Sequence, residues 1–319
     1  MTVSSSGQPL VSIGDPVFNG DNFIEQALSS VLAQTMGDFE LVVSDNASTD
    51  RTGMICQDLA AGDRRIRYYR NDRNLGAGAN YNIAFAHSRG TYFKWLAHDD
   101  RIKPGYLAAT VAALDAAPDA ALCNAVVDYI DSRGQHIGYY DSGLAGADDP
   151  RPSRRFATMI LMSHSCVDFF GLCRRSTLVD SMLHGPFHGA DRAFLAQMAL
   201  RGRLLQVKEP LVEMREHDQR YTRSKQDAKG RAAWHDAARA KARTLPTWRL
   251  YREYVELVAK EQLTPAERTA CRLALLRWWI VNWNSIRASV DIGALAWPRL
   301  PHHAETVKIR LFGKAPGHF

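Results

Sequence analysis

The sequence predicts an α/β fold with a doubly wound, mostly parallel sheet and a helical C-terminal extension. Two observations carry this prediction. Strand-like and helix-like segments alternate four times within about the first hundred residues, which is typical of parallel sheets. Residues 221–319, in contrast, are basic and hold six of the seven Trp residues, which sets them apart as a separate region.

The predicted strands are short apolar runs, and the helices between them place apolar residues at helical spacing. The second helix follows three good capping residues, Ser48, Thr49 and Asp50. Strands are expected at residues 10–14, 39–44, 66–69 and 91–97. The helices carry Ile24, Ala27, Leu28, Val31 and Leu32, then Met54, Ile55 and Leu59, then Ile83, Ala84 and His87.

Two adjacent acids, Asp99 and Asp100, follow the fourth predicted strand. Paired carboxylates at a strand exit suit a divalent cation, because hard metals prefer oxygen ligands. The alternative is a solvated turn with Asp as the N-cap of a helix before Pro104, and this segment alone leaves both interpretations open. Pro16 and Asp45 also lie at strand exits. A parallel sheet brings such exits to one edge, where ligands bind in open α/β sheets.

The second half of the chain offers a further acid and a basic pair. Residues 167–173 are predicted to form a strand, and an amphipathic helix with Leu195, Met198 and Ala199 is predicted to end at Gly202. Asp191 lies at the start of that helix, where a plain N-cap or first-turn acid is also expected. Arg215 and His217 are two residues apart and would share one face of a strand.

Charge is unevenly distributed along the 319 residues. Residues 221–319 contain 18 Lys and Arg against 8 Asp and Glu, whereas the rest is slightly acidic. The basic, Trp-rich run 273–283 is too short to span a bilayer, but it suits a helix on an anionic membrane surface. A helical bundle with a Trp core and a homodimer interface are the alternatives. Binding to nucleic acid is not expected, because no binding motif accompanies the dispersed Arg residues.

Other features of the composition limit location and domain organisation. The polar residues 1–9 predict a disordered start without a signal peptide, and no apolar stretch is long enough for a membrane span. The five Cys are scattered and predict apolar fillers in a reducing compartment. We expect a catalytic domain over residues 10–220 and a basic helical region over 221–319.

Four motifs occur in the order and spacing of a known family. Residues 16–19, 44–50, 74–76 with Asn80, and 95–100 resemble the ordered motifs of glycosyltransferase family 2, over roughly residues 10–220. The resemblance implies the GT-A fold, which is Rossmann-like, together with nucleotide-sugar donors and inversion at the anomeric carbon. Many members carry a further Asp where this chain has Ala97, so the division of labour between Asp99 and Asp100 is not fixed by the resemblance.

The resemblance also implies roles for individual residues. Asp191 corresponds to the general base that deprotonates the acceptor hydroxyl, although Ala190 replaces the Glu that usually precedes it. Asp100, Asp99 and His217 would hold Mn²⁺ or Mg²⁺, and Arg215 would contact the diphosphate. Nucleotide binding would fall to Pro16, Phe18, Asn19, Asp45, Asn74, Asn80 and Asp99.

We therefore expect an inverting, metal-assisted glycosyltransferase. It would move sugar from a UDP- or dTDP-sugar to a glycan or glycolipid hydroxyl of the cell envelope. We expect it in the cytoplasm, peripheral on the inner face of the cytoplasmic membrane. A non-catalytic nucleotide-sugar-binding protein of the same fold is one alternative. A nucleotidyltransferase is another, but residues 15–19 lack the Gly-rich basic loop of that class.

Overall fold

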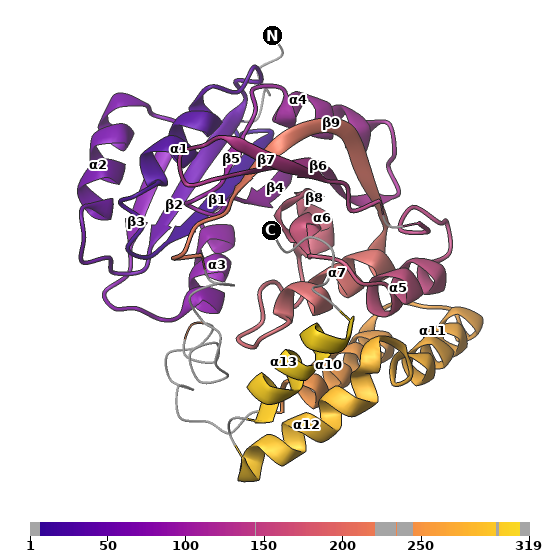
Figure 1. Cartoon of the computed structure of the whole chain (residues 1–319). Coiled ribbons are helices and arrows are strands. Elements are labelled where there is room, and N and C mark those ends of the chain that lie inside the picture. The colour runs from indigo at the N-terminus through magenta and orange to yellow at the C-terminus, as the bar shows by residue number, and fades with distance from the viewer. Residues whose placement is uncertain (1–6, 144, 221–233, 235–244, 298–299, 313–319) are drawn as a thin grey trace.

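The computed structural model describes residues 7–143, 145–220, 234, 245–297 and 300–312. Residues 1–6 of the predicted disordered start lie outside these ranges. Figure 1 shows one continuous curled sheet with helices on both sides, and the C-terminal helices gathered beside it.

The first four predicted strands form and pair in parallel, in the order β3-β2-β1-β4. Each is followed by a connection that returns over the sheet, as the alternating sequence pattern predicts. The elements are β1 (Val11–Val17), α1 (Ile24–Leu32), β2 (Phe39–Asp45), α2 (Thr52–Gly62), β3 (Ile66–Arg70), α3 (Ala77–Ala86) and β4 (Tyr92–Trp95).

The second half of the sheet mixes parallel and antiparallel pairs. From β4 it continues in the order β8-β6-β9-β5. Strand β7 also pairs with β6, farther along that strand than β8 does. The long strand β9 curls across the molecule, parallel to β6 and antiparallel to β5 (Figure 1). The elements are β5 (Arg101–Ile102), α4 (Tyr106–Asp115), β6 (Ala120–Ile130), β7 (His136–Tyr140), α5 (Pro152–Leu161), η1 (Val167–Phe170), β8 (Leu172–Arg174), α6 (Arg175–Leu178), α7 (Ala190–Arg201) and β9 (Arg203–Arg215).

Two local predictions were wrong in this half. Residues 167–170 form the 3-10 helix η1 instead of a strand, and of the predicted strand only Leu172 and Cys173 pair in the sheet, as part of β8. Cys166 precedes η1 with a left-handed φ of 61°, which turns the chain out of the extended conformation. Helix α7 is also less amphipathic than predicted, because every residue from Ala193 to Leu200 is buried.

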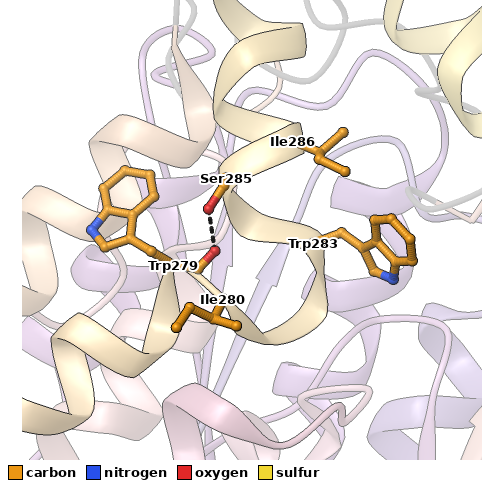
Figure 2. A pocket seen from close by; sticks show the side chains of 5 residues that line it. All are labelled: Trp279, Ile280, Trp283, Ser285 and Ile286. Atoms are coloured by element: carbon orange, nitrogen blue, oxygen red, sulfur yellow. Dashed lines mark hydrogen bonds between the residues drawn. The ribbon is translucent and has the colours of Figure 1, made fainter.

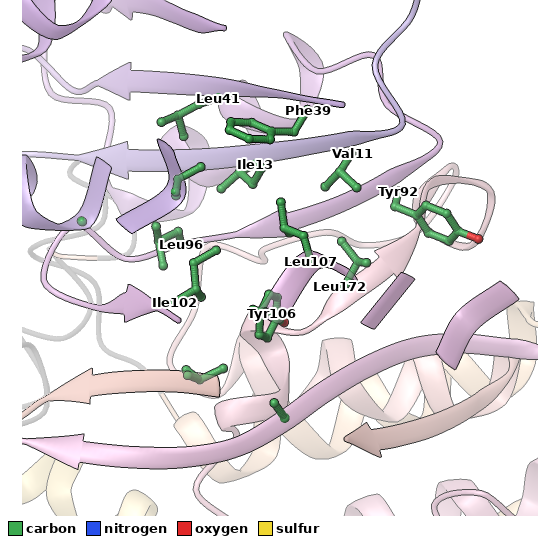
Figure 3. Close-up of a cluster of buried hydrophobic side chains, with 14 of the residues drawn as sticks. Val11, Ile13, Phe39, Leu41, Tyr92, Leu96, Ile102, Tyr106, Leu107 and Leu172 are labelled. Atoms are coloured by element: carbon green, nitrogen blue, oxygen red, sulfur yellow. The ribbon is translucent and has the colours of Figure 1, made fainter. Parts of the chain in front are cut away.

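Two apolar clusters hold the layers together. The first lies on the face of the sheet covered by α1 and α4, and Figure 3 shows its members Ile13, Leu41, Leu96 and Tyr106. The second cluster includes Trp95, whose ring stacks on Phe169 with centroids 4.9 Å apart. Because this second cluster joins β4 to α7 and the C-terminal helices, it fixes the position of α7 relative to the strand exits.

The C-terminal helices pack on the second half of the chain. They are α10 (Pro246–Lys260), α11 (Pro265–Trp278), the 3-10 helix η3 (Val281–Trp283), α12 (Asn284–Ala296) and α13 (Leu300–Phe312). Helix α11 lies against α5, and α10 contacts α7. The run 273–283, which we predicted as one helix, is broken after Trp278. Trp278 is buried, whereas Trp248, Trp283 and Trp297 are exposed, so the bundle accounts for only some of the Trp residues.

No helix among the described residues combines the length and apolarity needed to cross a membrane. All five Cys are free and buried, as expected for apolar fillers.

Candidate active site

The parallel register brings the predicted strand exits to one edge. Val17 of β1 pairs with Asp45 of β2, and the Asn46 N–H donates to the Val17 carbonyl oxygen at 2.8 Å. On the other side of β1, Gly14 pairs with Trp95, and the Leu96 N–H continues the ladder. The chain then turns through Asp99 and Asp100. Residues from the loops that follow β1, β2 and β4 therefore lie at this edge.

Asp45 is fully buried at this edge. Its Oδ1 accepts from the Ser48 N–H at 2.8 Å, and its Oδ2 accepts from the Tyr68 hydroxyl at 2.6 Å and Arg70 Nη1 at 2.5 Å. Beside it, Arg70, Asn71, Asp72, Arg73 and Leu75 line a hollow of about 470 Å³. The hollow has the size of a nucleoside site and a partly basic wall.

The predicted nucleotide-binding Asn residues have different environments. Asn80 is buried and accepts from the Ser44 hydroxyl at 2.7 Å while donating to the Ser44 carbonyl oxygen, so it ties α3 to β2. Asn74 is exposed and accepts from Asn46 Nδ2 at 3.0 Å and from the Gly76 N–H at 2.8 Å. Both Asn residues therefore shape the loops at the edge.

The predicted loop after β1 carries one exposed aromatic ring. Phe18 is 42% exposed, so its ring does not pack in the core. Asn19 has a left-handed φ of 52° and its Oδ1 accepts from the Thr49 N–H at 2.8 Å. Pro16 is buried within β1. The ring of Phe18 is thus available at the surface for stacking on a base.

The two acids after β4 have opposite electrostatic environments. Asp99 Oδ2 lies 2.9 Å from His217 Nε2, and Asp100 Oδ1 accepts from the Arg215 N–H at 2.9 Å. Burial and then the neighbouring Asp99 charge raise the pKa of Asp100 to about 7. Burial opposes ionisation of Asp99, but His98, His217 and Arg220 together lower its pKa. The pKa values of the two carboxyl groups are therefore shifted in opposite directions.

The acid pair fits a cation that arrives with its nucleotide. Among the residues that the structure describes, no group of three or more His, Cys, Asp or Glu side chains could hold a metal ion. Mg²⁺ and similar ions are commonly bound by one or two carboxylates together with substrate phosphates. Asp99 and Asp100 each keep one oxygen without a hydrogen-bond partner among the described residues, so they could supply these ligands. His217 would have to bind through Nδ1.

The guanidinium of Arg215 is engaged by the protein itself. Arg215 is fully buried and lies over the ring of Phe23, with 4.4 Å from its Cζ to the ring centroid. It donates to the carbonyl oxygens of Asp99, Asp131 and Ser132 at 3.0–3.2 Å and to Gln26. Arg215 thus fixes the loop that carries Asp99. Contact with a diphosphate, as predicted, would require some of these bonds to be released.

Asp191 lies at the start of α7, as predicted. It is partly buried in the first turn, where its Oδ1 accepts from the Arg192 N–H at 2.8 Å. Burial raises the pKa of the Tyr81 hydroxyl, and the charges of Asp99, Asp15, Asp100 and Asp191 raise it further. Burial lowers the pKa of the nearby His184 to about 4, so this imidazole is neutral beside Asp191.

Sequence reasoning missed several residues of the site. Arg220 lies close enough to both carboxylates to lower the pKa of each. Tyr81 lies on the face of α3 that we read only as core, and Lys94 is a buried cation inside β4. The signal for Lys94 and Asp15 was available, because a charged residue in an apolar strand is unusual.

Asp15 is the most unusual of these residues. It is fully buried in β1, and within the described part of the chain neither carboxylate oxygen has a hydrogen-bond partner. Burial, followed by the charge of Asp99, raises its pKa well above the usual value. An acid of this kind stays protonated in the folded state and destabilises it at neutral pH.

We expect Asp15→Val to raise the free energy of unfolding by about 1–3 kcal/mol, because it removes a buried carboxyl group whose two oxygens have no hydrogen-bond partner among the described residues. The gain should grow as pH rises above about 4, since the unfolded chain then releases a proton that folded Asp15 retains. Chemical denaturation at acidic and neutral pH measures both effects. Asp15→Asn, which keeps unpaired polar atoms, should gain much less. Equal stability of all three proteins would contradict this account.

The curled sheet with its flanking helices and the acidic strand edge define a glycosyltransferase of GT-A fold. The family model described as glycosyl transferase family 2 matches residues 12–178, more than half of the chain. The chain therefore belongs to glycosyl transferase family 2, as its motifs predicted.

Curated relatives match over part of the chain. An uncharacterised glycosyltransferase of Rickettsia typhi is 41% identical over 96 residues, which are 30% of this chain and 29% of that protein. The uncharacterised glycosyltransferase EpsJ of Bacillus subtilis is 37% identical over 94 residues, 30% of this chain and 27% of EpsJ. The matched stretch thus spans less than a third of either relative.

Solved structures share the fold over most of the chain. S. aureus TarS 1-349 in complex with UDP-GlcNAc aligns with a TM-score of 0.60 at 16% identity, covering 85% of this chain and 72% of that one. The mannosyltransferase PcManGT from Pyrobaculum calidifontis, in complex with GDP-Man and Mn²⁺, aligns with a TM-score of 0.56 at 17% identity. It covers 96% of this chain and 82% of that one. These likenesses confirm the predicted fold class.

Proposed function

We propose that this protein is an inverting glycosyltransferase that uses a nucleoside-diphosphate sugar and a divalent metal. The observation that carries the proposal is the placement of Asp99 and Asp100 together at the strand edge, in a chain that also carries Asp191 in the first turn of α7. Both TarS and PcManGT were solved with nucleotide sugars, which supports this donor class. A UDP- or dTDP-sugar is the donor that we propose.

In this mechanism the nucleoside lies along the edge formed by β1 and β2. Phe18 stacks on the base, and Asp45 with Arg70 forms the polar wall beside it. Asn19, Asn74 and Asn80 hold the surrounding loops, with Pro16 beneath them. Asp99 and Asp100, joined by His217, bind Mn²⁺ or Mg²⁺, and such a cation stabilises the charge of a departing diphosphate.

Asp191 acts as the general base. Its carboxylate accepts the proton of an acceptor hydroxyl while that oxygen attacks the anomeric carbon, and the nucleoside diphosphate leaves from the opposite face. This geometry inverts the anomeric centre. The alternative, a non-catalytic protein that only binds nucleotide sugars, would not need Asp191 as a base for an acceptor hydroxyl.

Calorimetry with a UDP-sugar tests the metal role. We expect binding to be clearly tighter in Mn²⁺ than in EDTA, and the difference to disappear in Asp100→Asn. Because the Asp100 carboxyl has a pKa of about 7 and must lose its proton to bind a cation, affinity should fall about tenfold from pH 8 to pH 6. A UDP-sugar is preferable to UDP, whose terminal phosphate titrates in this range.

Equal affinity in Mn²⁺ and EDTA would refute the metal assignment. Asp119→Asn is a suitable control, since Asp119 is an exposed acid paired with Arg203 away from the site.

We further propose that the acceptor is a glycan or glycolipid of the cell envelope, and that the protein works in the cytoplasm at the inner face of the membrane. The basic C-terminal region supports this location. The division into a catalytic domain over 10–220 and a helical region over 221–319 is part of the same proposal.

A further inference from the structure

The corner between α11 and α12 exposes several large apolar side chains. We call Leu273, Leu276, Ile280, Trp283 and Ile286 the corner patch. All five side chains are more than half exposed, with Ile280 at 83% and Leu276 at 63%. Trp279, Ile280, Trp283, Ser285 and Ile286 line an open groove of about 420 Å³. Figure 2 shows Ile280, Trp283 and Ile286 extending from the turn in different directions, each away from the backbone.

This exposure is not distributed over the whole protein. Twelve of the eighteen large hydrophobic side chains exposed among the described residues lie in residues 245–312. A different face of helix α11 packs in the interior of the protein, where Cys271, Ala274, Leu275 and Trp278 are buried. The patch is therefore a second apolar face, beyond the one that folding uses, and such patches mark interaction surfaces.

The corner is held in a defined shape. The Ser285 hydroxyl donates to the Trp279 carbonyl oxygen (Figure 2), and buried Asn284 donates to the Trp278 carbonyl oxygen at 2.8 Å. Trp283 adopts a left-handed φ of 59°, a conformation that bulky residues rarely take. The backbone at Trp283 is therefore locally strained, and the side chain that it carries is exposed.

The charge around the corner patch identifies its partner. Residues 268–290 contain four Arg and no Asp or Glu. Arg272, Arg277 and Arg287 are exposed beside the patch. A mixture of Trp, Ile, Leu and Arg without acids suits an anionic bilayer surface, where apolar groups enter the headgroup region and Arg binds lipid phosphates. A second copy fits less well, because a two-fold contact would place these Arg residues against each other.

We propose that the corner patch docks this protein on a bilayer containing anionic lipids. Ile280 and Trp283 enter the interface, while Arg272 and Arg277 contact lipid phosphates. The proposal stands apart from the transfer chemistry, since the patch contains none of the residues assigned to the active site.

Vesicle co-sedimentation of the full chain tests it, with phosphatidylcholine alone and with about one third phosphatidylglycerol. We expect binding only to the anionic vesicles, and weaker binding at high salt. Ile280→Glu should reduce this binding at least tenfold. Met54→Glu is the matched control, because Met54 on α2 is similarly exposed, at 54%, but lies outside the patch. It should bind as the wild type does.

The paired variant Arg272→Gln with Arg277→Gln should lose about 10- to 30-fold in affinity, since each basic residue near such a surface contributes about 1 kcal/mol. Arg64→Gln with Arg154→Gln removes two exposed charges elsewhere and should have little effect. Thermal melts and UDP-sugar calorimetry confirm that each variant folds and keeps its nucleotide site.

Two results would overturn the proposal. One is vesicle binding that does not depend on lipid charge, or that the control substitutions weaken as much as the substitutions in and beside the patch do. The other is absence of vesicle binding, with Ile280→Glu converting a dimer to a monomer in sedimentation velocity, which would assign the patch to a second copy.

Discussion

Asp191→Asn is expected to lower turnover by roughly 10²–10⁴-fold while the affinity for the nucleotide sugar stays nearly unchanged. The substitution keeps the size of the side chain and its Oδ1, so the bond from the Arg192 N–H can persist. It removes only the basic oxygen that would accept the proton of the acceptor hydroxyl. Initial rates of sugar transfer, together with donor calorimetry, separate the two effects.

The matched control is Glu25→Gln. Glu25 is also an acid in the first turn of a helix, on α1, and it is exposed. Its loss removes the same favourable charge from a helix N-terminus without approaching the base. If Asp191→Asn transfers sugar at nearly the wild-type rate, Asp191 is not the base and is only an acid in the first turn of α7. A parallel loss in both variants would point to helix stability instead.

Arg215→Met is expected to lower the free energy of unfolding by about 3 kcal/mol or more. Methionine can still cover Phe23, but the carbonyl oxygens of Asp99, Asp131 and Ser132 would lose their donor in a buried place. The loop with Asp99 and Asp100 would then be released. Chemical denaturation measures the loss, and Arg133→Met, at an Arg whose side chain is 83% exposed, provides the control.

The same variant decides between the two roles of Arg215. If the side chain mainly positions the loop, stability falls and binding of both uridine and UDP weakens. If it mainly clamps the diphosphate, stability changes little and only UDP binding weakens, because uridine has no phosphates. The second pattern would contradict the positioning role.

The strand edge could be predicted because its determinants are local and repetitive. Apolar runs at 10–14, 39–44 and 91–97 fix the strands, and alternation with helices fixes a parallel register. Parallel register alone then places Val17 beside Asp45 and Gly14 beside Trp95. The prediction for residues 167–173 failed because an apolar run fits a strand or a packed turn equally well. The break after Trp278 was likewise invisible to a hydrophobic pattern.

The sequence by itself thus determined the family, the parallel half of the sheet and the edge where the acids emerge. Only the tertiary structure decided which of these groups share one environment. Phe169 and Phe194 pack on Trp95 although they lie far along the chain from it, and this packing joins α7 to the strand that leads to the acid pair. Long-range packing also buries three other groups. It raises the pKa of Asp100, surrounds the Arg215 guanidinium with carbonyl oxygens, and leaves the Asp15 carboxyl without a hydrogen-bond partner among the described residues.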